Sequence, residues 1–173
     1  MPNPLETMSA KTAGAAAAVS ARAKGLTGVF NKLAQQHKEA ATLLKRAERT
    51  HDPEKRQDLW STVRRELLSH ERAEASILYT ELATHAATQD IAERHSDEAQ
   101  TLEATIAEID VVGYDSPNWT SLVQRLITLV EHHVDEEENE FFPRAEDTIG
   151  KDAAQALESR LVAAKERLME ELA

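Results

Sequence analysis

Glycine and proline are confined to a few short clusters in this chain, and long uninterrupted stretches separate those clusters. The chain has only 5 Gly and 5 Pro among 173 residues, and residues that favour helices, such as Ala, Leu, Glu, Lys and Arg, dominate the rest. Hydrophobic residues make up 41% of the chain, which is enough for one sizeable core. The sequence therefore predicts an all-α domain built from long helices.

Four stretches carry apolar residues at the three- and four-residue spacing of an amphipathic helix. The first runs from Phe30 to Leu44, the second from Val63 to Leu78, the third from Ile91 to Ile109 and the fourth from Leu122 to Phe141. Short connections between consecutive helices of this length favour an up-down-up-down four-helix bundle.

Helix-start signals support these boundaries. Asp52 and Pro53 are predicted to begin the second helix as its cap and its first residue, and Ser116 is predicted to cap the fourth. Pro143 is predicted to kink or end the fourth helix, because proline lacks the amide hydrogen that a helix interior needs.

Both ends of the chain add a segment to the bundle. Residues 1–25 are rich in Ala and are predicted to form a flexible or loosely docked N-terminal segment. The bundle is predicted to occupy residues 26–173, including an extra C-terminal helix at about 151–172 that packs across it.

Charge and composition exclude several classes of function. The formal net charge of −11 opposes binding to nucleic acid or to an anionic membrane surface, and no apolar run is long enough to span a membrane. The chain has no Cys, which excludes disulfides, iron–sulfur clusters and thiol catalysis. A cytoplasmic location is expected, because the Ala-rich stretch at 11–23 lacks the Leu-rich core of a signal peptide.

Each of the four apolar faces has a histidine in its middle, and two of these histidines have a glutamate four residues later. Residues at i and i+4 lie one turn apart on the same face of a helix, so each such pair points at one layer of the bundle. The six residues are His37, His70, Glu74, His95, His133 and Glu137. The order of a lone His followed by a His-x3-Glu pair occurs twice, which predicts a bundle with pseudo-two-fold symmetry.

Buried carboxylates are costly unless a positive charge compensates them, and no Lys or Arg occupies the matching positions. Four imidazoles and two carboxylates are too many ligands for one tetrahedral zinc ion, and a nitrogen-rich set does not suit calcium or magnesium. We therefore predict two metal ions that share the two carboxylates. Imidazole with carboxylate suits iron first, with manganese or zinc left open.

From about residue 30 to residue 147, the chain resembles the haemerythrin family in its bacterial form, the HHE cation-binding domain. That family has a lone His, a His-x3-Glu pair, a second lone His, and a His-x3-Glu-Glu segment with an aromatic-Pro end. The matching residues are His37, His70, Glu74, His95, His133, Glu137, Glu138 and Phe141-Phe142-Pro143. The resemblance implies an oxo- or hydroxo-bridged di-iron centre that meets O2, peroxide or nitric oxide.

One position departs from that pattern. Family members that carry O2 have another His four residues after the third-helix His, and Ala99 stands at that position here. The resemblance then implies that one terminal ligand is absent, with Glu98 lying to the side of the site. We expect a more open metal pair, suited to redox chemistry, sensing or iron handling rather than to reversible O2 carriage.

Three functions are consistent with these residues. The first is a di-iron protein that reacts with O2 or peroxide, through peroxide decomposition or oxidase activity. The second is a non-catalytic iron or oxygen sensor, or an iron-storage module, that acts through a partner. The third is a purely structural metal bundle. The remaining histidines, His51, His85 and His132, are predicted to lie outside the site, near helix ends or on the surface.

Overall fold

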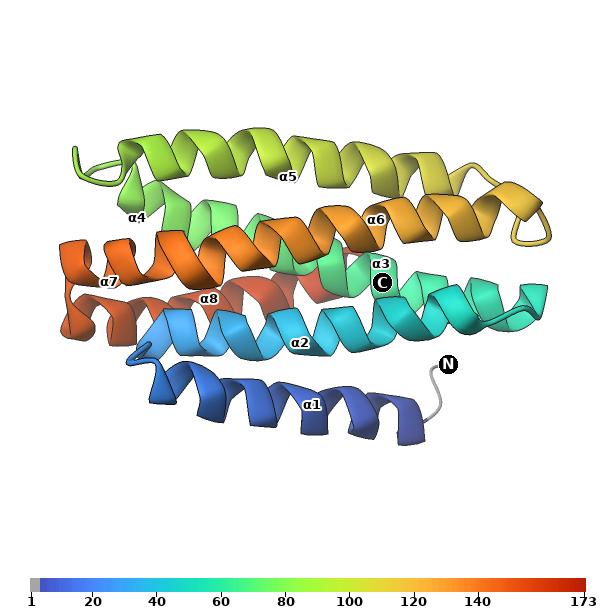
Figure 1. Cartoon of the computed structure of the whole chain (residues 1–173), viewed down its shortest axis with the longest axis horizontal. Helices are drawn as coiled ribbons and strands as arrows, with labels where there is room; N and C mark the ends of the chain where they lie inside the picture. The colour runs from blue at the N-terminus through green and yellow to red at the C-terminus, as the bar shows by residue number, and fades with distance from the viewer. Residues whose placement is uncertain (1–3) are drawn as a thin grey trace.

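The computed structural model describes residues 4–173, and every regular element in that range is helical (Figure 1). The elements, of which η1 and η2 are π-helical, are α1 (Pro4–Ala23), α2 (Gly28–Arg49), α3 (Pro53–Glu74), η1 (Ala75–Tyr79), α4 (Thr80–Leu82), α5 (Gln89–Asp110), α6 (Pro117–Glu136), η2 (Glu137–Phe141), α7 (Phe142–Ile149) and α8 (Lys151–Glu171). The predicted all-α fold is confirmed.

Four long rods lie side by side and form the bundle (Figure 1). The first rod is α2 and the third is α5. The second rod consists of α3, η1 and α4, and the fourth consists of α6, η2 and α7. The predicted extra C-terminal helix is α8, which packs along α2 and α3. No helix among the described residues has the length and apolar character that crossing a membrane requires.

The N-terminal helix α1 lies along the outer side of α2 (Figure 1). The two helices approach closely at Gly14, where a Cβ atom would lie 2.9 Å from the carbonyl oxygen of Gln35. The predicted N-terminal segment, 1–25, is helical over most of its length, since α1 spans Pro4–Ala23. Its first three residues lie outside the described part of the chain.

The predicted helix starts are confirmed by their hydrogen bonds. The side chain of Asp52 accepts a hydrogen bond of 3.0 Å from the amide of Lys55, and Pro53 is the first residue of α3. The side chain of Ser116 accepts a hydrogen bond of 3.2 Å from the amide of Asn118. These contacts satisfy amide groups that the first helical turn leaves without a partner.

The fourth rod does not end at Pro143, contrary to one of the two outcomes predicted for that residue. The rod passes through η2, where the amide of Phe142 donates to the carbonyl of Glu137 five residues back, and it continues as α7. This wider turn changes the hydrogen-bond pattern just before Pro143, which supplies no amide hydrogen. The second rod widens in the same way, because the amide of Thr80 donates to the carbonyl of Ala75.

The core consists of two apolar clusters, one toward each end of the bundle. The phenylalanine cluster includes Phe30, Leu82, Phe141 and Phe142 together with residues of α8. The tryptophan cluster includes Trp60 and Trp119, whose rings pack edge to face, together with aliphatic residues of α2, α3, α5 and α6. Along each rod, the histidine of the predicted site lies between residues of one cluster and residues of the other. A polar layer therefore separates the two halves of the core.

Candidate metal centre

All six predicted site residues are buried in this polar layer, and their side chains converge on the axis of the bundle. Each is at most 4% exposed: His37, His70, Glu74, His95, His133 and Glu137. Mid-helix placement brings them together, because each rod presents one face to the axis and the histidine stands in the middle of that face. The structure therefore assembles the complete predicted set.

One half of the centre lies between α2 and α3. Nε2 of His37 is 3.1 Å from Oε2 of Glu137, and Nε2 of His70 is 3.3 Å from Oε2 of Glu74. The two imidazole rings have centroids 5.0 Å apart. His37, His70 and Glu74 each offer a ligand atom close enough to the others to hold one metal ion.

The other half lies between α5 and α6. Nε2 of His133 is 3.4 Å from Oε2 of Glu137. Nε2 of His95 is 3.9 Å from an oxygen of Glu74 and 3.9 Å from an oxygen of Glu137. Glu74 and Glu137 therefore lie within reach of imidazoles in both halves, as two shared carboxylates must.

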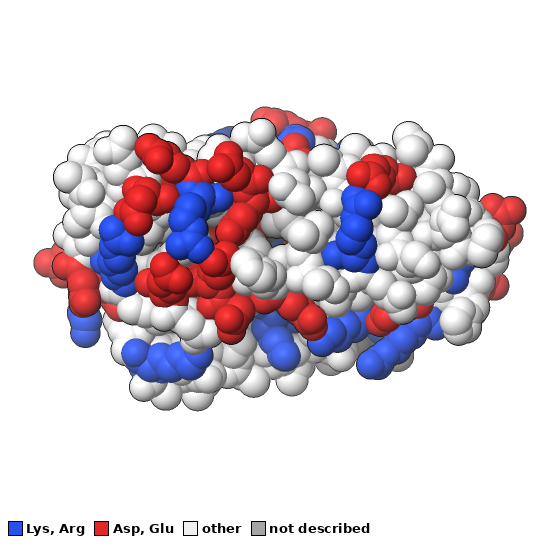
Figure 2. Space-filling model, turned by 45° about the horizontal axis from the view of Figure 1, so that its top comes forward, with Lys and Arg blue, Asp and Glu red and all other residues white. Residues whose placement is uncertain are grey.

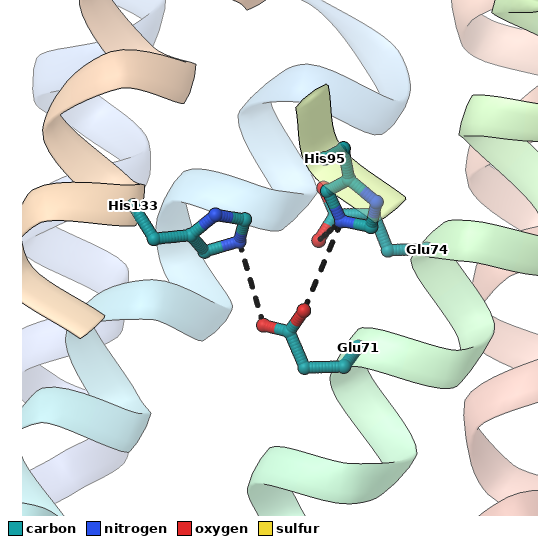
Figure 3. A group of neighbouring side chains, drawn as sticks. All are labelled: Glu71, Glu74, His95 and His133. Atoms are coloured by element: carbon teal, nitrogen blue, oxygen red, sulfur yellow. Dashed lines mark ion pairs between the residues drawn. The ribbon is translucent and has the colours of Figure 1, made fainter. Parts of the chain in front are cut away.

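Glu71 is a third buried carboxylate in the centre and is not one of the six predicted residues. Its side chain lies between the histidines of α5 and α6, with one oxygen 3.5 Å from Nε2 of His133 and the other 3.8 Å from Nε2 of His95 (Figure 3). Glu71, Glu74, His95 and His133 form a group that could hold a metal ion. A signal was present in the sequence, since Glu71 precedes Glu74 by three residues and so shares its helix face.

The inward-facing atoms of this centre have no hydrogen-bond partners among the described residues. These buried atoms are Nε2 of His37, His70, His95 and His133, Oε2 of Glu71 and Glu137, and both carboxylate oxygens of Glu74. Buried polar atoms in folded proteins are almost always hydrogen-bonded, so such a concentration requires an explanation. Metal cations provide one, because every one of these atoms is a nitrogen or oxygen donor that metals bind. The residues therefore fit a metal centre.

Outward-facing nitrogens of three histidines are held by neighbouring side chains. Nδ1 of His70 lies 2.9 Å from the amide oxygen of Gln36. Nδ1 of His37 lies 2.9 Å from a carboxylate oxygen of Glu138, and Nδ1 of His133 lies 2.8 Å from one of Glu98. Such contacts orient metal-binding imidazoles and leave Nε2 free to face inward. Glu98 and Glu138 therefore support the site from outside and do not face its centre.

Burial changes the protonation of the inner groups. Burial raises the pKa of the Glu74 carboxyl to about 7, although the nearby imidazole of His37 opposes the shift. Burial lowers the pKa of His70 to about 3, so its imidazole is neutral at pH 7, as metal ligation requires. Burial and the carboxylate of Glu137 raise the pKa of Tyr79 well above its ordinary value. The Tyr79 hydroxyl stays protonated and donates a 2.6 Å hydrogen bond to Oε1 of Glu137.

The three other histidines lie outside the centre, as predicted. His51 is exposed in the connection before α3. His85 is partly exposed beside Glu81, with 3.4 Å between Nε2 and the carboxylate. The side chain of His132 is 69% exposed although its neighbour His133 is buried. Adjacent helical residues point about 100° apart, which explains the difference.

A helical bundle with a buried layer of imidazoles and carboxylates defines a class of metal-binding four-helix-bundle proteins. The family model described as Hemerythrin HHE cation binding domain matches residues 28–145. The chain belongs to this family, and the matched region contains all six predicted site residues and Glu71.

A curated protein named DNA nickase, from Nostoc sp. strain PCC 7120, is similar to this chain, with 22% identity over 136 residues. The similar region covers 79% of this chain and 38% of that relative, so the chain spans well under half of the relative's length. No solved structure matches the chain. Cation binding by a haemerythrin-like bundle is the property that the family match and the buried cluster support together.

Replacing Glu71 by Ala is expected to remove about one of the two metal ions from each chain. The reason is that the Glu71 carboxylate lies against His95 and His133, which belong to one half of the centre. Elemental analysis of the purified variant measures the loss. Glu54→Ala, on the exposed first turn of the same helix, is the control and should keep full metal content. Equal metal content in both variants would show that Glu71 is not a ligand.

Proposed function

We propose that this chain holds two metal ions, iron in preference to manganese or zinc, and reacts with or senses O2 or peroxide, with nitric oxide as a further ligand. The observation that carries the proposal is the set of buried, unpartnered Nε2 and carboxylate oxygen atoms that face one another in the polar layer. Imidazole and carboxylate in this ratio suit iron, and the family match to a cation-binding domain supports the same reading.

The residues divide into two ligand sets with two shared members. His37 and His70 would hold one ion, whereas His95, His133 and Glu71 would hold the other. Glu74 and Glu137 would serve both, since each lies near imidazoles of both halves. Tyr79 orients Glu137 through its hydrogen bond. When bound, the irons would supply the electrons and the open coordination positions that reactions with O2 or peroxide need.

Glu71 changes the expectation that followed from Ala99. The position four residues after His95 supplies no ligand, but the Glu71 carboxylate lies 3.8 Å from Nε2 of His95 and takes up the space beside it. The half with His37 and His70 would then supply the smaller ligand set and would leave its ion the more open of the two. A third carboxylate also adds negative charge, which stabilises more highly charged metal ions. We therefore favour reaction or sensing over reversible carriage of O2.

The test is the metal content, visible spectrum and peroxide reactivity of protein purified with iron present. We expect about two irons per chain, a visible charge-transfer band, and faster loss of hydrogen peroxide than with metal-free protein. A reproducible single zinc ion per chain, unchanged by iron supplementation, would contradict the proposal. Two irons with no response to peroxide or O2 would leave the structural metal bundle as the better reading.

The nickase similarity adds no second function, because the described surface does not favour DNA. The net charge is −11, and Figure 2 shows acidic side chains gathered around a few basic ones on one face. Basic groups are also already paired between rods, as Arg144 is with Asp90 and Arg94 is with Glu140. Phosphate binding needs unpaired Lys and Arg in excess.

The alternative to the proposed function is a sensor or iron-storage module that lies in the cytoplasm and acts through a partner.

A further inference from the structure

A cavity lies beside the metal centre, between α5 and the rod formed by η1 and α4. Its volume is about 840 Å³, which lies within the range of sites that bind small organic molecules. O2 and peroxide need far less room than this. The cavity therefore offers space that the proposed reaction does not use.

Short side chains create this space. Ala75 and Ala83 line one wall, and Ala92, Ser96 and Ala99 line the wall that α5 provides. Ala99 stands one turn after His95, where a larger residue would fill the inner part of the cavity. The cavity is open to solvent at its outer end, where the longer side chains of Glu93 and Glu103 lie.

The inner end of the cavity is built from two buried rings. Tyr79 and His95 both line it, and their rings stack with centroids 3.6 Å apart and an interplanar angle of 15°. Both side chains are more than nine-tenths buried, at 4% and 1% exposure. The hydroxyl of Tyr79 donates its one hydrogen to Glu137, so it has no hydrogen left to donate to a ligand.

His95 differs from the other three histidines of the centre. Their Nδ1 atoms are held by Gln36, Glu138 and Glu98, whereas Nδ1 of His95 has no hydrogen-bond partner among the residues that the structure describes. Since the imidazole lines the cavity, a molecule in the cavity can supply the missing partner. A hydroxyl group suits this role in particular, because it can accept from Nδ1–H or donate to an unprotonated Nδ1.

The charge of the lining restricts the ligand. Glu93 and Glu103 line the cavity, and no Lys or Arg does. Glu103 is paired with Arg72, but Glu93 has only a long contact with the amide of Gln89. An anion entering the cavity would meet the carboxylate of Glu93 with no Lys or Arg among the described lining residues, so the lining favours an uncharged ligand.

We propose that this cavity binds an uncharged organic molecule that carries a hydroxyl or carbonyl oxygen, and that this oxygen meets Nδ1 of His95. Its occupant lies against a ligand of the metal centre and against the tyrosine that orients Glu137. The site thus gives the protein a second ligand, distinct from O2 or peroxide. This proposal goes beyond the function proposed above and depends on the cavity rather than on the metal.

Phenol is the probe, because it is small, uncharged at pH 7 and carries one hydroxyl. In calorimetry on the purified chain, phenol should bind with a dissociation constant of about 1 mM or lower. Benzoate, the anionic counterpart of similar shape, should bind at least about tenfold more weakly. No phenol binding, or equal binding of phenol and benzoate, would overturn the proposal.

Two variants locate the binding. Ala99→Phe and Ala75→Phe fill the cavity from opposite walls, and each should weaken phenol binding roughly tenfold or more. Ala104→Phe is the matched control, because it makes the same change at an exposed position on α5 outside the cavity. Phenol binding that is unchanged in both cavity variants would refute the location.

Metal content measured on the same samples separates this proposal from the proposed function. Phenol binding in a chain that holds no metal would support the cavity site while the di-iron function fails. Two metals per chain without phenol binding would support the metal centre and refute the cavity site.

Discussion

Replacing Glu137 by Ala is expected to reduce the metal content from about two ions per chain to almost none. Glu137 contacts imidazoles from both halves of the centre, at 3.1 Å from Nε2 of His37 and 3.4 Å from Nε2 of His133. Its loss would also leave the hydroxyl of Tyr79 without its acceptor. Both ions should therefore be lost together, in contrast to the loss of one ion in Glu71→Ala.

Elemental analysis of protein purified in parallel with the wild type measures this effect. His132→Ala is the control, since it removes an imidazole five residues before Glu137 that is largely exposed and lies outside the centre. The control should keep about two ions per chain. A Glu137→Ala protein with full metal content would mean that the polar layer does not hold the metal.

Removal of the metal is expected to lower the thermal stability of the wild-type chain by roughly 10 °C. Ligands that bind only the folded state stabilise it by about 4 kcal/mol when present at 1,000 times their Kd. For a domain of this size, 1 kcal/mol corresponds to about 2–4 °C in Tm. Without a cation, the carboxylates of Glu71, Glu74 and Glu137 stay buried with only imidazoles beside them to balance their charge.

Calorimetry of metal-free and iron-loaded protein measures the difference in Tm. Glu137→Ala provides the comparison, because its Tm should be the same with and without added iron. The metal-free variant should also be less stable than the metal-free wild type, because Glu137→Ala leaves the buried hydroxyl of Tyr79 without its acceptor. Equal Tm values for metal-free and iron-loaded wild type would argue against a metal site in the core.

Apolar spacing predicts the rods, and the polar residues that interrupt it predict six side chains that the structure brings together in one buried layer. His37 and His95 stand out because each is the one polar residue in the middle of an aliphatic face. The caps Asp52 and Ser116 were predictable because their hydrogen bonds are local, within three residues along the chain. Local rules of this kind need no knowledge of how the helices pack.

Features that depend on neighbouring helices were not predictable. Glu71 shares a helix face with Glu74, but its burial in the centre depends on how α3 packs against α2, α8 and α5. Glu98 and Glu138 reach the outer nitrogens of histidines on other rods, and no spacing rule within one helix encodes such contacts. The continuation of the fourth rod through Pro143 likewise depends on the widened turn before it.

The separation of the core into two clusters affects how the centre can gain and lose its ions. Phe30 and Phe142 pack together at one end of the bundle, and Trp60 and Trp119 pack together at the other. Each end therefore has its own apolar contacts and can stay folded while the turns between them separate briefly. We therefore expect exchange of bound ions to require only a local opening at mid-length and to be faster than unfolding of the whole chain.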